Sequence, residues 1–344
     1  MQSEVCSDID FVIPWVDGSD PEWQKQLVSY HNFPTHSGGV RYRDWGILTY
    51  WFRAVEKYAP WVRKIHFITC GQVPKWLNLN HPKLHFVRHE DYIPSQWLPT
   101  FSSHPIELNL HRIEGLEEKF VYFNDDMFLN APVKPEDFFF DNLPCATAAL
   151  SAGPSGIEEL GAMAYFTLNN IQIIIKNFDF RTSFKANIRK WLTPRYGFKP
   201  LMKTFLCLPF MRYTGFHEVH TAISYLKSTF VEVWKKARDE CETTSSHKFR
   251  EKSDVNQWLM EYWQFMSGNF HPRSGNFSVV YDNKNYVMGN KGIKTITSDI
   301  LRSKHKVICL NDSAAIKEED LEQIFRRIRD ALNEALPEKS AFEL

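Results

Sequence analysis

The chain has 344 residues, with 41 basic and 41 acidic side chains, and aromatic residues make up 15% of it. This length is enough for one large domain or two modest ones with a sizeable core. The aromatic content excludes a disordered chain, and the balanced charge argues against a nucleic-acid partner.

Three features of the sequence predict a cytoplasmic protein. No apolar run reaches the roughly 18 residues that a membrane-spanning helix needs. The N-terminal residues MQSEVCSDID lack the basic and apolar regions of a secretory signal. The six cysteines are scattered without a CxxC pair, which is too sparse for a disulfide scaffold and lacks zinc-binding spacing.

Strand-like and helix-like stretches alternate through the first 140 residues. Such alternation predicts an α/β fold whose sheet has parallel strands. Asp44 is placed to cap one of the helices, and Pro60 to end it. The expected strands cover residues 9–16, 64–69, 84–87 and 119–123, and the expected helices cover 44–59 and 106–113.

The strand signal weakens between residues 155 and 270, where stretches at 231–238 and 255–265 look helical. Short strands return at 277–281 and 307–310, a final helix follows Asp312, and the tail PEKSAFEL is expected to fray. We therefore expect a core half over residues 1–150, a mainly helical insertion over 151–270, and a return to the core over 271–344.

Acidic side chains follow two of the predicted strands. Asp17 comes after the first strand, and Asn124, Asp125 and Asp126 come after the strand at 119–123. Open α/β sheets bind ligands at the carboxyl ends of their strands, and paired carboxylates there suit Mg²⁺ or Mn²⁺. The alternative is an acidic turn. Trp15 could stack on a base or sugar, or belong to the core.

Other motifs are weaker. No dinucleotide, P-loop, nucleophile-elbow or HExxH motif occurs, and the pair His217 and His220 lacks an evident third zinc ligand. Residues 181–216 hold eight Lys or Arg and no Asp or Glu, interleaved with aromatics. This stretch could contact an anionic membrane surface, hold a phosphate-rich acceptor, or be a solvated basic face.

The chain resembles the Stealth proteins, a family of sugar-phosphate transferases that have four conserved regions. It includes bacterial capsule polymer phosphotransferases and the catalytic subunits of animal N-acetylglucosamine-1-phosphotransferase. The first region matches IDFVIPWVDGSDP, and the third matches more loosely within residues 215–268. The fourth matches CLND at 309–312. The second, residues 41–140, includes RYRDWGILTYWFRAVEKYAPWVRKIHFITCGQVPKWLN and LPTFSSHPIELNLHRIEGLEEKFVYFNDDMFL.

The resemblance implies a Rossmann-like or glycosyltransferase-A-like nucleotide-sugar core that carries a helical insertion. The implied reaction moves a hexose-1-phosphate from a nucleotide-sugar to a hydroxyl of a growing saccharide, with a divalent cation. The product would be a phosphodiester-linked capsular or exopolysaccharide, made at or near the cytoplasmic membrane face beside polymer export machinery. The alternatives are a metal-dependent glycosyltransferase and a catalytically inactive carbohydrate-binding protein.

The resemblance also implies roles for individual residues. Those that match the family motifs are expected to form one site around the bound nucleotide-sugar. His217 would be the general base, with His220 as the alternative, and Arg250 would clamp phosphate. Asp17, Asp125 and Asp126 would hold or order the cation, Asn311 and Asp312 would close the site, and Arg43 and Asp44 would contact the donor.

Overall fold

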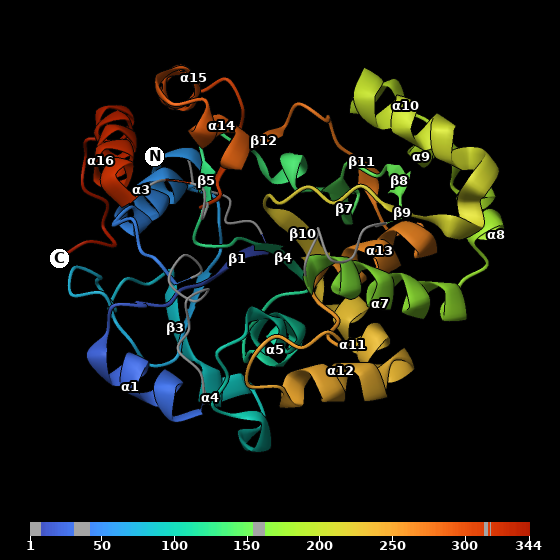
Figure 1. Ribbon diagram of the computed structural model, residues 1–344, viewed down its shortest axis with the longest axis horizontal. Coiled ribbons are helices and arrows are strands. Elements are labelled where there is room, and N and C mark those ends of the chain that lie inside the picture. Colours follow the sequence, from blue (N-terminus) through green and yellow to red (C-terminus); the bar gives the residue numbers. More distant parts are fainter. Residues whose placement is uncertain (1–7, 31–41, 154–161, 313–315, 317) are drawn as a thin grey trace.

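A five-stranded sheet lies at the centre of the computed structural model, in the order β10-β4-β1-β2-β3 (Figure 1). Strands β1 to β4 run parallel, and β10 joins β4 antiparallel. The bounds are Ile9–Pro14 for β1, Ile65–Thr69 for β2, Leu84–Arg88 for β3, Lys119–Tyr122 for β4 and Ile223–Leu226 for β10. The predicted α/β class is confirmed, and the parallel order reverses at β1 as in Rossmann-like sheets.

The structure describes residues 8–30, 42–153, 162–312, 316 and 318–344. Arg41, the first residue of the second matched region, lies outside these ranges. Three smaller sheets, β11-β7-β6, β12-β13-β5 and β8-β9, flank the central one. Their strands are β5 Met127–Leu129, β6 Phe139–Phe140, β7 Leu143–Ala146, β8 Leu150–Ala152, β9 Thr214–Phe216, β11 His271–Pro272, β12 Ser278–Tyr281 and β13 Val307–Leu310.

Helices cover both faces of the central sheet (Figure 1). On one face lie α3 Leu48–Tyr58, α15 Asn290–Arg302 and α16 Glu318–Ala335. The other core includes residues of α4 His89–Tyr92, α5 Ser103–Leu108, α7 Ala162–Asn177, α8 Phe180–Ala186, α9 Ile188–Trp191, α11 Lys227–Lys236, α12 Arg238–Ser246 and α13 Trp258–Ser267. The remaining helices are α1 Pro21–Tyr30, α10 Phe198–Cys207 and α14 Asn283–Val287.

Strand β1 is apolar on both sides because it is buried on both sides. Phe11 and Ile13 pack in the core with α3, α15 and α16, whereas Val12 packs in the opposite core. Successive side chains of a strand point to opposite faces, so a doubly covered parallel strand is a nearly continuous apolar run.

Three local predictions were wrong. Asp44 does not cap α3, which begins at Leu48 after Ile47; its carboxylate instead accepts a hydrogen bond from the amide of Gly46 at 2.8 Å. The helix expected at 106–113 is α5, which begins earlier because the Ser102 hydroxyl accepts a hydrogen bond from the amide of His104. It is followed by a 3₁₀ turn at Leu110–Arg112. The C-terminal tail does not fray: Glu343 forms an ion pair with Arg53 at 2.8 Å, and Phe342 is buried. These contacts come from α3, about 290 positions earlier in the chain, which is why a local reading missed them.

Asp10 on β1 is a fully buried carboxylate with a complete set of donors. It accepts hydrogen bonds from Arg63 at 2.9 and 2.6 Å, from the backbone amide of Glu117 at 2.9 Å, and contacts His66 Nε2 at 2.9 Å. Burial alone would raise the pKa of Asp10, but His66 and Arg63 outweigh it and lower the pKa. The charged form is therefore favoured by folding.

We expect Asp10→Asn to lower the free energy of unfolding at pH 7 by about 3 kcal/mol, since it breaks a buried ion pair. The carboxylate contribution is fully present above the unfolded-state pKa of about 3.9, and it is lost as the pH falls through the lower folded-state pKa. Urea unfolding between pH 3 and 7 should show this acid loss in the wild type and a shallower dependence in the variant.

Asp8 provides the control for this measurement. Asp8 lies two positions before Asp10 and pairs with Lys119, but the Asp8 side chain is 66% exposed. Asp8→Asn should change the free energy of unfolding by no more than about 0.5 kcal/mol. Equal losses in the two variants would show that burial of the Asp10 network does not contribute as argued.

Candidate active site

A cavity of about 620 Å³ opens at the carboxyl edge of the central sheet. It lies where the strand order reverses between β1 and β4, which is where open α/β sheets bind ligands. Its walls come from the segments after β1, β4 and β13, from the start of α5, and from residues 250–258. The volume is in the usual range for small-molecule sites.

Carboxylates crowd one part of this cavity. Asp125 remains accessible to solvent there, yet the surrounding protein, together with the charges of Asp126 and Asp44, raises its pKa to about 7. Partial burial and the charge of Asp17 likewise raise the pKa of Asp44. Carboxylates held this close repel one another, and the repulsion disfavours the charged state of the group.

Asp126 is held between a histidine and a cysteine. His220 Nε2 lies 3.4 Å and the Cys309 thiol 3.3 Å from the Asp126 carboxylate. Burial would raise the pKa of Asp126, but the charge and hydrogen bond of His220 lower it below its ordinary value. Burial conversely lowers the pKa of His220, and Asp126 outweighs this and raises it. The two side chains therefore behave as an ion pair.

The carboxylate cluster fits a divalent cation. Oδ1 of Asp126 is buried and has no hydrogen-bond partner in the described part of the chain, so a lone pair is available. Ligand atoms of Asp126, His220 and Cys309 lie within 4.8 Å of one another. Burial and Asp126 raise the pKa of Cys309, so it stays a neutral thiol, a poor ligand for a hard cation. Asp125 and Asp126 are the better oxygen ligands.

The matched regions of the sequence meet at the rim of the cavity. Arg43 lies 3.3 Å from the Asp312 carboxylate, and Trp45 Nε1 donates to the same carboxylate at 3.1 Å. Residues nearly 270 positions apart are thus joined. Asn311, the neighbour of Asp312, also lines the cavity, and its amide donates to the carbonyl of Tyr281 at 3.0 Å.

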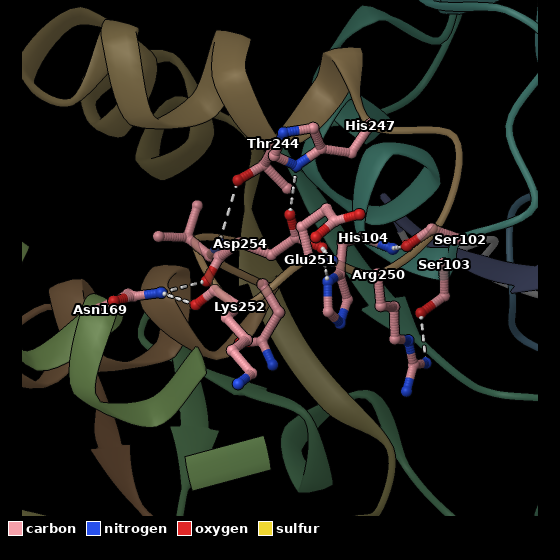
Figure 2. Close-up of polar contacts among 12 residues, drawn as sticks. Ser102, Ser103, His104, Asn169, Thr244, His247, Arg250, Glu251, Lys252 and Asp254 are labelled. Atoms are coloured by element: carbon pink, nitrogen blue, oxygen red, sulfur yellow. Dashed lines mark hydrogen bonds and ion pairs between the residues drawn. The ribbon is translucent and has the colours of Figure 1, made fainter. Parts of the chain in front are cut away.

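A second group of polar side chains surrounds Asp254, as Figure 2 shows. His104 Nδ1 lies 2.9 Å from one oxygen of Asp254, and His247 Nδ1 lies 2.7 Å from the other. Asp254 is fully buried and His104 almost so, yet His104 lines the cavity. Because Nδ1 donates to the carboxylate, the neutral ring carries its lone pair on Nε2. Burial, followed by the charge of Arg250, lowers the pKa of His104.

Arg250 lies beside this group and also lines the cavity. Its Nη2 donates to Ser103 Oγ at 2.9 Å, at the start of α5 (Figure 2). The adjoining Phe249 stacks on Phe101 with ring centroids 5.3 Å apart, and the amide of Phe101 donates to the carbonyl of Lys248 at 2.8 Å. These contacts fix the segment that carries the guanidinium.

The structure gathers most of the residues expected from the sequence. Eight of them line the cavity, namely Trp15, Arg43, Asp44, Asp125, Asp126, Arg250, Asn311 and Asp312. Asp17 and His217 are not among its lining residues. The Asp17 carboxylate accepts hydrogen bonds from the amide and hydroxyl of Ser19, at 2.9 and 2.6 Å.

His217 follows β9 and contacts helix α10. Its Nδ1 is 3.2 Å from Lys203 Nζ on α10, and its amide donates to the carbonyl of Ala149. Burial and the charge of Lys203 lower the pKa of His217 to about 4. His217 is therefore not among the lining residues of the cavity, whereas His220 is.

Several cavity residues were missed from the sequence. The hydroxyl of Tyr122, at the end of β4, lies 3.1 Å from Glu107 Oε1 and 2.5 Å from Asn124 Oδ1. His104 and Glu107 are three positions apart in the short helix α5, and this spacing would have placed them on one face of the helix. The partner of His104, Asp254, is 150 positions away, and no local pattern marks that pair.

The fold and the cavity define a ligand-binding α/β protein, and comparison with known proteins identifies its family. Residues 7–32 match the model of Stealth protein conserved region 1, and residues 41–146 match that of conserved region 2. A capsular polysaccharide phosphotransferase, WcwK of Streptococcus pneumoniae, is 44% identical over 97% of this chain and 98% of its own. The chain belongs to the Stealth family of phosphotransferases and is a transferase.

Two further phosphotransferases agree with this placement. An exopolysaccharide phosphotransferase, cps2G of Lactiplantibacillus plantarum, is 39% identical over 98% of this chain and 96% of its own. A receptor polysaccharide phosphotransferase, WefC of Streptococcus gordonii, is 40% identical over 98% of this chain and 99% of its own. The crystal structure of galactosyltransferase LgtC aligns over 94% of this chain and 95% of its own, with a TM-score of 0.39 and 10% identity.

Within the described residues, no helix has the length and apolar character to cross a membrane.

Proposed function

We propose that this protein moves a hexose-1-phosphate from a nucleotide-sugar to a hydroxyl of a growing saccharide, and so builds phosphodiester-linked capsular or exopolysaccharide. One cavity combines five carboxylates, among them Asp125 and Asp126, with the guanidinium of Arg250 and the carboxylate-bound His104. Carboxylates suit a divalent cation, a guanidinium suits phosphate, and a neutral imidazole suits a hydroxyl proton. The names of the relatives support this reaction class.

In the proposed reaction, the acceptor oxygen attacks the phosphorus atom that carries the sugar. The hydroxyl proton passes to a base on the enzyme, and the phosphorus–oxygen bond to the nucleoside monophosphate breaks. The nucleoside monophosphate leaves, and the glycosidic bond to phosphate survives. Such a transfer depends on positioning and on neutralising the phosphate charge.

We assign the base to His104. His104 lines the cavity, and the contact of its Nδ1 with Asp254 leaves the lone pair of the neutral ring on Nε2, the arrangement that orients a general base. His220 is instead committed to Asp126. Arg250, which Ser103 helps to orient, would hold the transferred phosphate.

A divalent cation, Mg²⁺ or Mn²⁺, would be held by Asp125 and Asp126 and would neutralise the diphosphate charge when bound. His220 would keep the Asp126 carboxylate oriented toward it. Trp15, Arg43 and Asp44 would contact the donor, with Asn311 and Asp312 closing the site. Residues 1–150 would supply the cation ligands, most donor contacts and the base, residues 151–270 would add Arg250 and the basic stretch, and residues 271–344 would complete the core. The enzyme would act at the cytoplasmic membrane face beside the export machinery.

The products of the reaction test this function. The protein, a panel of nucleotide-sugars, Mg²⁺ or Mn²⁺ and an oligosaccharide acceptor should release a nucleoside monophosphate and lengthen the acceptor by a sugar phosphate, both visible by mass spectrometry. Release of the nucleoside diphosphate instead would identify a glycosyltransferase. Donor binding without turnover across all acceptors would indicate an inactive carbohydrate-binding protein.

A further inference from the structure

Helix α10 exposes large apolar side chains where a water-facing helix normally carries polar ones. Phe198, Met202, Phe205 and Leu206 are 77, 42, 55 and 67% exposed. Figure 1 shows α10 at the periphery of the molecule, away from the central sheet. Contiguous exposed apolar patches of this kind are rare in soluble proteins and mark interaction surfaces.

These four side chains share one face of the helix. They are spaced four, seven and eight positions from Phe198, which at 3.6 residues per turn places them within about 100° of one another. Thr204 points the other way: it is fully buried, and its hydroxyl accepts a hydrogen bond from the amide of Leu150 on β8. We call the outward surface of these four apolar side chains the α10 face.

The segment that carries the α10 face is positively charged. Residues 181–216 contain eight Lys or Arg and no Asp or Glu. The exposed cations among them are Arg181, Lys185, Arg189, Arg195 and Lys199. In the described part of the chain none of these five forms an ion pair with a carboxylate. The surface is therefore both apolar and cationic, which is the composition of helices that lie in the interface of an anionic bilayer.

We infer that the α10 face docks on an anionic lipid surface, with its apolar side chains among the acyl chains and the basic residues near the headgroups. A second copy of the chain fits less well, because a symmetric contact would bring two sets of cations together. A nucleic acid would leave Phe198, Phe205 and Leu206 without an apolar partner.

The α10 face is connected to the cavity through a short path in the structure. Helix α10 packs on β8, and β8 pairs with β9, from which the chain runs through His217 to His220 in the cavity wall. Lys203 of α10 contacts His217 directly at 3.2 Å. Docking would thus hold the cavity close to the bilayer, where a lipid-anchored acceptor would be presented; this consequence for the acceptor rests on the proposed function, whereas the docking does not.

Co-sedimentation with vesicles tests the docking on the full chain, without any nucleotide-sugar. The wild type should bind vesicles of phosphatidylglycerol and phosphatidylcholine, and binding to phosphatidylcholine alone should be at least tenfold weaker. The double variant Phe205→Ser/Leu206→Ser should lose on the order of tenfold or more in partitioning, because it removes the apolar contacts that these two side chains would make with the acyl chains. Lys185→Gln/Lys199→Gln should lose several-fold per charge and weaken the salt dependence.

Val231 on α11 and Leu301 on α15 supply the matched control. They are 54 and 45% exposed but lie outside the basic stretch, so Val231→Ser/Leu301→Ser should bind like the wild type. Light scattering should show the same oligomeric state for the wild type and the Phe205→Ser/Leu206→Ser variant, and thermal unfolding should confirm that each variant folds.

Three results would overturn the inference. The first is wild-type partitioning of the Phe205→Ser/Leu206→Ser variant, and the second is no binding of the wild type to the anionic vesicles. The third is a dimer that this variant dissociates, which would assign the α10 face to a second copy. Because vesicle binding is measured without donor, its failure is distinguishable from a failure to release nucleoside monophosphate.

Discussion

Asp126→Asn should lower the rate of sugar-phosphate transfer by on the order of 10²-fold or more. The substitution keeps the shape of the side chain but removes the charge that would hold a cation and that pairs with His220. Excess chelator should likewise abolish turnover of the wild type, and Mg²⁺ or Mn²⁺ should restore it. Monophosphate release, followed by mass spectrometry under saturating donor, measures both effects.

Asp137→Asn is the control for loss of one carboxylate. Asp137 pairs with Lys306 at 2.6 Å and is not a lining residue of the cavity. Its variant should retain wild-type turnover. Full activity of the wild type in excess chelator would contradict the metal assignment, and full activity of Asp126→Asn would remove this carboxylate from the reaction.

His104→Gln should lower kcat by roughly 10²–10⁴-fold, the usual scale for loss of a general base. Donor binding should be largely spared, because the base acts on the acceptor. In the wild type, kcat should fall on acidification, since the base must be neutral at the start of each turnover. Burial and Arg250 lower the pKa of His104, so this acid limb should lie below the ordinary value of about 6.5.

Asp254→Asn separates positioning from a structural role. Asp254 raises the pKa of His104 through their hydrogen bond, so its loss should move the acid limb of the profile to lower pH. It should also reduce kcat, because an amide no longer fixes the tautomer with the Nε2 lone pair. A merely destabilised protein would lose activity without this shift, and thermal unfolding would reveal it.

Two further histidines complete the comparison. His305 forms a similar pair with Asp299 at 2.6 Å and is not part of the cavity lining, so His305→Gln should keep wild-type turnover. His217→Gln decides between the two assignments of the base. If it loses as much as predicted for His104→Gln while His104→Gln remains active, the resemblance identified the base and the cavity geometry did not.

The sequence was sufficient for the four parallel strands of the central sheet and for its acidic edge, but β10 falls where the strand signal is weak. Strands such as β1 and β4 are apolar on both faces, and the chain turns polar where they end, at Asp17 and Asn124. These are local properties, set by residues within a few positions of one another. Since the carboxyl ends of neighbouring parallel strands share one edge, the motif positions alone predicted that Asp125 and Asp126 would line a cavity.

The choice among the histidines could not be made from the sequence. His217 and His220 are three residues apart, and after the end of β9 the chain directs the first toward Lys203 and the second toward Asp126. An irregular segment has no helix or strand periodicity from which the direction of a side chain could be predicted. Only the packing of β9 and β10 therefore decides which ring enters the cavity.

The sequence by itself therefore determined the α/β class, the carboxylate edge and the family, because periodicity and contiguous motifs are local. Only the tertiary structure decided that His104 meets Asp254, that Arg43 meets Asp312, and that the C-terminal tail packs on α3. Each of these contacts joins residues 150 or more positions apart. Such pairs depend on how the helices pack on the two faces of the sheet, and α10 has an outward apolar face for the same reason: its position on β8 buries Thr204 instead.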